Sequence, residues 1–222
     1  MDAPVIAIDG PSGSGKGTIA RRVAEALGFH LLDSGALYRL TAISAQKRGV
    51  ELTDSDSVAE IARNLDIRFD SFEDGSERIW LDSEDVTPEV RMESTGAGAS
   101  AVAAIEEVRA ALLERQRAFE RTPGLVADGR DMGTHVFPHA LVKVFLTASA
   151  EERAKRRFKQ LKDKGMDVSL AALSRDIEDR DRRDTERLVA PLKPAKDARI
   201  LDSSGKSIEA VVQTVLDWVA EL

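Results

Sequence analysis

The sequence predicts an α/β fold in which a parallel five-stranded sheet carries helices on both faces. Short apolar runs, most of them rich in Val, Ile and Leu, alternate with longer stretches that have the pattern of amphipathic helices. Buried parallel strands read as continuous apolar runs, and strands that alternate with helices are typical of βαβ units. A glycine-rich loop between the first apolar run and a helical pattern supports the same order of strand and helix.

Five segments are predicted to form the strands of this sheet. They are residues 4–9 (PVIAID), 29–33 (FHLLD), 124–128 (GLVAD), 141–146 (LVKVFL) and 198–202 (ARILD). The last helix is predicted from apolar residues that recur at three- and four-residue steps, which gives one stripe facing the sheet. These are Ile208, Val211, Val212, Val215, Leu216 and Val219.

Two segments depart from the simple alternation. Between Asp66 and Val86, short alternating runs flank the turn sequence EDGS, which predicts a small antiparallel hairpin inserted into the core. From Glu151 to Arg187 the chain is mostly charged and helical and is broken once, at Gly165, which predicts a solvated helical pair that is able to move. No linker or internal repeat divides the chain, so we expect a single domain.

Composition limits the classes of function. With 222 residues the chain can bury a substantial core, and its net charge of −7 gives no general attraction to a nucleic acid polymer. The absence of cysteine excludes disulfides, thiolate metal sites and cysteine nucleophiles, and it fits a reducing cytoplasm. No apolar run approaches the roughly 18 residues of a membrane span, and no apolar leader follows Met1. We expect a soluble, cytoplasmic protein and a monomer.

The stretch VIAIDGPSGSGKGT (5–18) carries the clearest chemical motif. Its glycines allow positive φ angles and bring backbone N–H groups around an anion, and Lys16 adds a mobile positive charge. The following helix contributes its N-terminal amides and dipole. A strand, the pattern G-x-x-x-x-G-K and a helix define a phosphate-binding loop of the P-loop NTPase fold. The expected ATP-binding residues are Gly10, Pro11, Ser12, Gly13, Ser14, Gly15, Lys16, Gly17 and Thr18.

A glycine-rich turn that binds nothing is the simpler alternative for this loop. It is disfavoured because glycine costs about 1 kcal/mol at helical positions and such a turn needs no lysine. The residue after the lysine is Gly17 rather than Ser or Thr, so the hydroxyl that could bind Mg²⁺ arrives one place later. Thr18 is therefore the candidate ligand of Mg²⁺.

A phosphate loop alone does not choose among a regulatory switch, a motor ATPase and a kinase. The chain has no Asn-Lys-x-Asp segment to read guanine, and no apolar strand ends in paired acids. Instead GLVADGRDMGT (124–134) ends a strand in Asp128, followed by Arg130 and Asp131. Strand ends of this kind open at the carboxyl edge of the sheet, beside the phosphate loop. An arginine at that edge is placed to meet an anion.

Four segments, GPSGSGKGT, LLDSGALYR, ADGRDMGT and RDRRDTERLVAPL, together resemble the bacterial cytidylate kinases, which phosphorylate CMP and dCMP. The resemblance extends to DSSGKSIEAVV and so covers nearly the whole chain. It implies a parallel core, a nucleoside monophosphate-binding insertion at about 39–101 that holds the hairpin, and a lid at about 151–187. It also implies ATP, as its Mg²⁺ complex, and CMP or dCMP as substrates, with no nucleic acid polymer and no membrane as partners.

The resemblance also assigns roles to individual residues. The acceptor phosphate would be bound by Ser34, Arg39, Arg130 and Arg187, the base by Ser100, Arg109 and Asp131, and the ribose by Arg180 and Asp184. Lys16, Arg130 and Arg187 would be catalytic, because bringing two anions into line is mostly a matter of charge neutralisation and positioning. A carboxylate such as Asp131 accepts from the exocyclic amine of cytosine and would meet a lone pair on uracil.

Some of these residues have a structural alternative. Ser100 and Arg109 fall in residues 100–119, which are predicted to form one long helix whose charged residues would ordinarily be solvated. Arg182 and Arg183 are predicted to form surface ion pairs. One of the arginines at 153, 156 and 157 is expected to reach the ATP phosphates when the lid closes, but the sequence does not say which.

Two other functions remain open from the sequence. The acceptor could be another small molecule, as in shikimate or adenylate kinases. The chain could also be a nucleotide-dependent switch or scaffold that binds without turnover, although a switch would not require arginines for a second anion.

Overall fold

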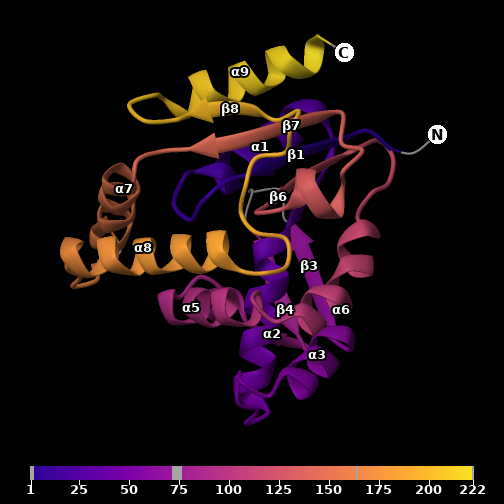
Figure 1. The fold of residues 1–222 in the computed structure, drawn as a ribbon, viewed down its shortest axis with the longest axis vertical. Helices are drawn as coiled ribbons and strands as arrows, with labels where there is room; N and C mark the ends of the chain where they lie inside the picture. The colour runs from indigo at the N-terminus through magenta and orange to yellow at the C-terminus, as the bar shows by residue number, and fades with distance from the viewer. Residues whose placement is uncertain (1–2, 72–76, 164, 222) are drawn as a thin grey trace. The chain divides into compact units, whose positions relative to one another are not determined.

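The computed structural model describes residues 3–71, 77–163 and 165–221 (Figure 1). Two compact units are distinguished: unit 1 consists of Met1–Asp33 and Gln116–Leu222, and unit 2 of Ser34–Arg115. The assignment of 39–101 to nucleotide binding and of 151–187 to a lid within one domain stays a prediction. None of the helices within the described ranges is long and apolar enough to cross a lipid bilayer.

Unit 1 is built on the predicted parallel sheet. Its strands are β1 (Val5–Asp9), β2 (His30–Asp33), β6 (Leu125–Gly129), β7 (Val142–Thr147) and β8 (Arg199–Asp202). They lie in the order β2-β6-β1-β7-β8, and every neighbouring pair is parallel. All five predicted strand segments are confirmed, each to within one residue of the observed bounds.

Because the strands are parallel, their carboxyl ends all lie at one edge of the sheet. From β1 the chain passes through a loop and α1 (Lys16–Leu27) to β2 on one side of the sheet, whereas β7 and β8 lie on the other side of β1. Ligands of such sheets bind beyond the carboxyl ends of the strands, where the strand order reverses. Asp9, Asp33 and Asp128 all lie at or next to this edge.

Helices cover both faces of the sheet in unit 1. On one face, Ile6 and Ile8 of β1 share a core with Val23 of α1 and Val215 of α9 (Ile208–Ala220). On the other face, the single helical turn η1 (Met132–Val136) buries its apolar side chains beside β1 and β6. Each fully buried Val or Ile contributes roughly 1.5–3 kcal/mol through its removal from water. The predicted stripe of the last helix is confirmed except at Ile208, which is 42% exposed.

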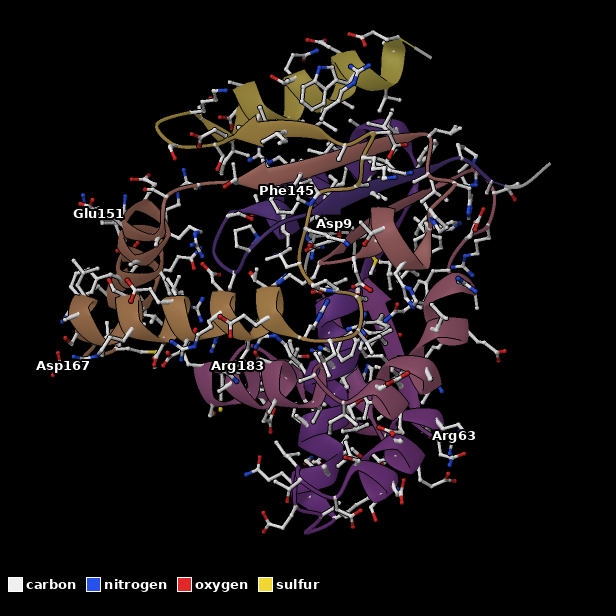
Figure 2. All side chains as sticks on the ribbon, in the orientation of Figure 1. Asp9, Arg63, Phe145, Glu151, Asp167 and Arg183 are labelled. Carbon is white, nitrogen blue, oxygen red and sulfur yellow. The ribbon has the colours of Figure 1, made fainter. Side chains whose placement is uncertain are left out.

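The charged segment forms the predicted helical pair. α7 (Ala150–Asp163) and α8 (Leu170–Glu186) pack against each other, with Gly165 in the connection at φ +74°. Figure 2 shows Glu151 near the start of α7, Asp167 in the connection and Arg183 on α8. The Ser169 hydroxyl accepts from the Ala172 N–H at 3.4 Å and caps α8.

Unit 2 contains helices and a second, smaller sheet. Its elements are α2 (Ser34–Lys47), α3 (Ser55–Arg63), β3 (Ile67–Ser71), β4 (Glu77–Leu81), β5 (Glu84–Asp85), α4 (Thr87–Val90), α5 (Glu93–Val102) and α6 (Glu106–Arg117). The predicted hairpin is confirmed as the antiparallel pair β3–β4, in which Phe69 lies opposite Ile79. Its turn sequence, residues 73–76, lies outside the described residues, and β5 adds a third strand that the sequence did not predict.

The single helix predicted over 100–119 is wrong, because the structure has two helices, α5 and α6. The chain tightens where α5 ends, and the N–H groups of Ala104 and Ile105 bond to carbonyls three residues back. The guanidinium of Arg109 donates to the carbonyl of Ala103 at 3.3 Å. A continuous helix would have used that carbonyl for the N–H four residues on. Glutamates 106 and 107 then begin α6, where acidic side chains favour a helix N-terminus.

Candidate active site

The phosphate loop follows β1 with the expected backbone. Gly13 and Gly15 lie in the left-handed region, at φ +77° and +91°, and Gly15 caps the N-terminus of α1. A Cβ on Gly10 would lie 2.0 Å from the carbonyl oxygen of Leu146. No side chain fits at that distance, so close packing of the loop on β7 requires glycine at position 10.

Lys16 is a buried cation in this loop. Its side chain extends so that Nζ donates to the carbonyl of Pro11 at 3.3 Å and lies 4.0 Å from Oδ1 of Asp128. Burial and, to a smaller extent, the nearby Arg130 lower the pKa of Lys16 to about 8, although Asp128 opposes the shift. Because the nearby carboxylates offset the cost of burying this charge only in part, the loop is suited to an anionic ligand.

Asp128, which ends the predicted third strand, belongs to the same group of charges. Burial raises the pKa of its carboxyl to about 6, against the effect of Lys16. Its Oδ1 atom makes no hydrogen bond within the part of the chain that the structure describes. A Cβ on Gly17 would lie 3.1 Å from Asp128 Oδ2, so a residue larger than glycine would displace this carboxylate. Thr18, which is exposed, lies in the first turn of α1.

Asp9 connects β1 to the segment that carries Arg130 and Asp131. It lies at the carboxyl end of β1 (Figure 2), where its two oxygens accept the N–H groups of Met132 and Gly133, each at 2.8 Å. Burial raises the pKa of Asp9 to about 7, although both of these hydrogen bonds lower it. The carboxylate therefore fixes η1 at the edge of the sheet.

Two ion pairs join the end of β6 to the end of α8. Arg130 donates through Nε to Asp184 at 2.9 Å, and Arg187 lies 3.6 Å from Asp131. Arg187 also donates through Nε to the carbonyl of Ala190 at 2.8 Å. Both aspartates are buried. Asp184 holds the guanidinium of Arg130 through a charge-assisted hydrogen bond, whereas Asp131 attracts that of Arg187 by its charge.

Two further arginines, Arg157 and Arg180, lie within electrostatic range of one another in this part of unit 1. Burial lowers the pKa of Arg180, and the nearby Arg130 contributes to the shift. Burial also lowers the pKa of Arg157, with Arg180 contributing. Arg180 therefore repels both Arg130 and Arg157, and an anion bound near it would relieve that repulsion. Arg182, as predicted, is exposed and pairs with Asp179 at 2.6 Å.

The first two arginines of α7 contact the phosphate loop. Arg153 donates to the carbonyl of Ser12 at 2.9 Å and forms a bidentate pair with Asp181. Arg156 donates to the carbonyl of Ser14 at 3.4 Å and to the hydroxyl and carbonyl of Ser203, at 3.1 and 2.7 Å. Both side chains are thus held by protein groups.

The remaining predicted residues lie in unit 2. Ser34 is buried at the start of α2, and Arg39 donates to the carbonyls of Val90 and Met92 at 2.9 and 3.2 Å. The hydroxyl oxygen of Ser100 is buried and has no hydrogen-bond partner among the described residues. Arg109 is buried rather than solvated, which excludes the surface role considered from the sequence. Its guanidinium carbon lies 5.8 Å from the centroid of the Tyr38 ring.

The parallel sheet, its phosphate loop and the paired arginines beside that loop are those of a P-loop kinase. The sequence matches the cytidylate kinase family over residues 6–221. It is 59% identical over 219 residues to the cytidylate kinase of Stutzerimonas stutzeri strain A1501, covering 98% of this chain and 96% of that protein. It is 54% identical over 216 residues to the cytidylate kinase of Cupriavidus necator strain H16, covering 97% and 95%. The chain belongs to the cytidylate kinase family.

Likeness to solved structures supports the fold. A crystal structure of an uncharacterised protein from Eubacterium ventriosum superimposes with a TM-score of 0.53 at 12% identity, covering 99% of each chain. At this identity the likeness concerns the fold alone.

Sequence reasoning found most of the charged residues around the loop but missed the residues that support them. The missed residues are Asp9, Asp128 as a site residue, Arg153 and Arg156 as loop contacts, and Ser203. Asp9, Asp128 and Ser203 share one signal: each is a polar residue at or directly after the end of an apolar strand. The contacts of the arginines with backbone carbonyls leave no such signal in the sequence.

Proposed function

We propose that the protein transfers the γ-phosphoryl group of ATP to CMP or dCMP, giving ADP and CDP or dCDP. The observation that carries this proposal is the buried ammonium of Lys16 in a phosphate loop, with Arg130 and Arg187 held by buried aspartates in the same unit. Membership of the cytidylate kinase family supports CMP as the acceptor.

The ATP phosphates are proposed to bind the loop from Gly10 to Thr18. The loop amides and the N-terminus of α1 supply donors, and Lys16 supplies the charge that neutralises the transferred group. Binding an anion beside Lys16 raises the pKa of its ammonium again, so the charged form persists in the complex at neutral pH.

The acceptor phosphate is proposed to bind Ser34, Arg39, Arg130 and Arg187. Its attacking oxygen is already ionised at neutral pH, so the chain needs no general base. What the arginines supply is positioning and cancellation of the repulsion between two polyanions. Asp184 and Asp131 hold two of these guanidiniums in place, which reduces the ordering that binding requires.

Recognition of the nucleoside is assigned to the remaining residues of the predicted set. Asp131 is proposed to accept from the cytosine amine, with Ser100 and Arg109 as further contacts to the base and Arg180 and Asp184 as contacts to the ribose. The buried, unpartnered hydroxyl of Ser100 is consistent with such a contact. Buried polar groups that lack a partner favour the ligand that supplies one.

Mg²⁺ is proposed to enter as the complex with ATP. The described residues contain no cluster of three or more acidic or histidine ligands, but Mg²⁺ bound with ATP takes most of its ligands from phosphates and water. The Oδ1 of Asp128, which makes no hydrogen bond among the described residues, and the hydroxyl of Thr18 fit this requirement as direct or water-mediated ligands. When bound, the ion would neutralise charge on the phosphate oxygens.

The finer organisation is proposed on the same basis. Residues 39–101 would form the CMP-binding insertion and 151–187 a lid that excludes water, which would otherwise accept the phosphoryl group. We infer a cytoplasmic monomer without nucleic acid polymers or membranes as partners. The net charge of −7 and the absence of cysteine support this inference.

A panel of acceptors tests the proposed function. ADP formation from ATP is measured with CMP, dCMP, UMP, AMP or shikimate, and with no acceptor. Turnover should be fastest with CMP or dCMP. Preference for AMP or shikimate would assign a different acceptor, and ATP consumption that does not depend on any acceptor would favour a switch.

A further inference from the structure

Three side chains outside the phosphate loop bond to carbonyl oxygens of that loop. Arg153, which is 4% exposed, donates to Ser12 O, and Arg156 donates to Ser14 O. The hydroxyl of Ser203, also 4% exposed, lies 3.2 Å from Ser14 O and 3.1 Å from Thr147 O. We name Arg153, Arg156 and Ser203 the carbonyl brace.

The geometry of the peptide bond gives these contacts a consequence for the other side of the loop. In a trans peptide unit the C=O of one residue and the N–H of the next point in opposite directions. Fixing the carbonyl of Ser12 therefore fixes the N–H of Gly13, and fixing the carbonyl of Ser14 fixes the N–H of Gly15. Both glycines have positive φ and no side chain, so little within the loop itself restricts their peptide planes.

We propose that the carbonyl brace positions the amides of Gly13 and Gly15 for the phosphates of ATP. This inference rests on the proposed function, since it concerns the same loop. An anion site binds strongly when its hydrogen-bond donors are preorganised, because the site then loses little conformational freedom on binding. The three residues are positioning residues, acting through the backbone without touching the nucleotide.

The contacts of Arg156 favour this role over a direct contact with phosphate. Its guanidinium already meets the carboxylate of Glu152 at 3.3 Å, the hydroxyl and carbonyl of Ser203, and the carbonyl of Ser14. Ser203 carries no charge and bonds to the same Ser14 carbonyl, so it serves as an uncharged probe of the same peptide unit.

The test measures the binding of Mg-ATP and of CMP separately by calorimetry. The proteins are the wild type, Ser203→Ala, Arg156→Gln and the double variant, and the matched controls are Ser204→Ala and Arg182→Gln. Loss of one net hydrogen bond predicts a roughly two- to tenfold weaker binding of ATP in each single variant. CMP binding should be unchanged. The double variant should bind ATP little more weakly than the weaker single variant, because both act on the peptide unit after Ser14.

Three results would overturn the inference. They are wild-type ATP affinity in either single variant, fully additive losses in the double variant, or an equal loss of CMP binding. Thermal unfolding identifies a variant that fails to fold. In that case the ATP affinity of the other single variant decides whether the inference stands. A wild type that binds ATP but does not phosphorylate CMP would contradict the proposed function and leave the carbonyl brace intact.

Discussion

Replacing Asp9 with asparagine should change how the stability of the protein depends on pH. Burial raises the pKa of this carboxyl from 3.8 to about 7, so the folded protein binds the proton more tightly than the unfolded chain does. The resulting contribution to stability is complete below pH 3.8 and is lost as the pH rises through 7. Asparagine has no proton to release, so the variant lacks this dependence.

The size of the effect follows from the shift. Each pH unit over which the two states differ by one proton is worth about 1.4 kcal/mol, so the loss between pH 5 and pH 8 is roughly 2–3 kcal/mol. The variant also carries a constant cost of about 1–3 kcal/mol, because its amide nitrogen cannot accept from Met132 or Gly133. Raising the pH should therefore shift the difference in unfolding free energy by roughly 2–3 kcal/mol in favour of Asp9→Asn.

Urea unfolding at pH 5 and pH 8 measures this shift. Asp197→Asn is a suitable control, because a hydrogen bond from Lys143 lowers the pKa of Asp197, so this carboxyl is ionised in the folded protein throughout pH 5 to pH 8. The difference between this control and the wild type should be the same at both pH values. If the difference for Asp9→Asn were equally constant, Asp9 would not be a buried carboxyl of raised pKa, and the reasoning would fail.

Three further predictions concern the loop and the base. Lys16→Ala should lower kcat at least a hundredfold without loss of thermal stability, because the folded state holds this buried ammonium at a cost; near-normal turnover would refute the role of the lysine. Asp131→Ala should reduce kcat/KM for CMP at least tenfold more than for UMP, whereas equal losses would remove Asp131 from base recognition. Gly10→Ala should destabilise the fold by about 3 kcal/mol or more in urea, since its Cβ would overlap the Leu146 carbonyl, and an unchanged midpoint would contradict that packing.

The sequence predicted the core of the fold because local and global signals agree there. The five strands are short apolar runs, and the glycines and lysine after residue 9 can hardly be explained by packing alone. The two-helix structure of α5 and α6 was missed because the apolar and small residues of 100–119 suit one continuous helix. Where α5 ends, the side chain of Arg109 bonds to the carbonyl of Ala103, and periodicity carries no information about such a contact.

The residues of the candidate site that act through their positive charge were predictable from the sequence. Lys16, Arg130 and Arg187 could be identified because phosphate recognition requires cations, and the resemblance to a family placed them in order. For Asp9 and Ser203 the sequence shows only a polar residue at a strand end. Their role was missed because they hold backbone groups of distant segments, Asp9 across 123 and 124 residues and Ser203 across 189. Such contacts depend on the assembled sheet and have no spacing along the chain.

The most direct test is a crystal structure with CMP bound. The account predicts that the CMP phosphate lies within hydrogen-bond distance of the guanidinium groups of Arg130 and Arg187, with the cytosine amine on Asp131. A CMP phosphate surrounded by neutral side chains alone, with neither Arg130 nor Arg187 within hydrogen-bond distance of it, would contradict it.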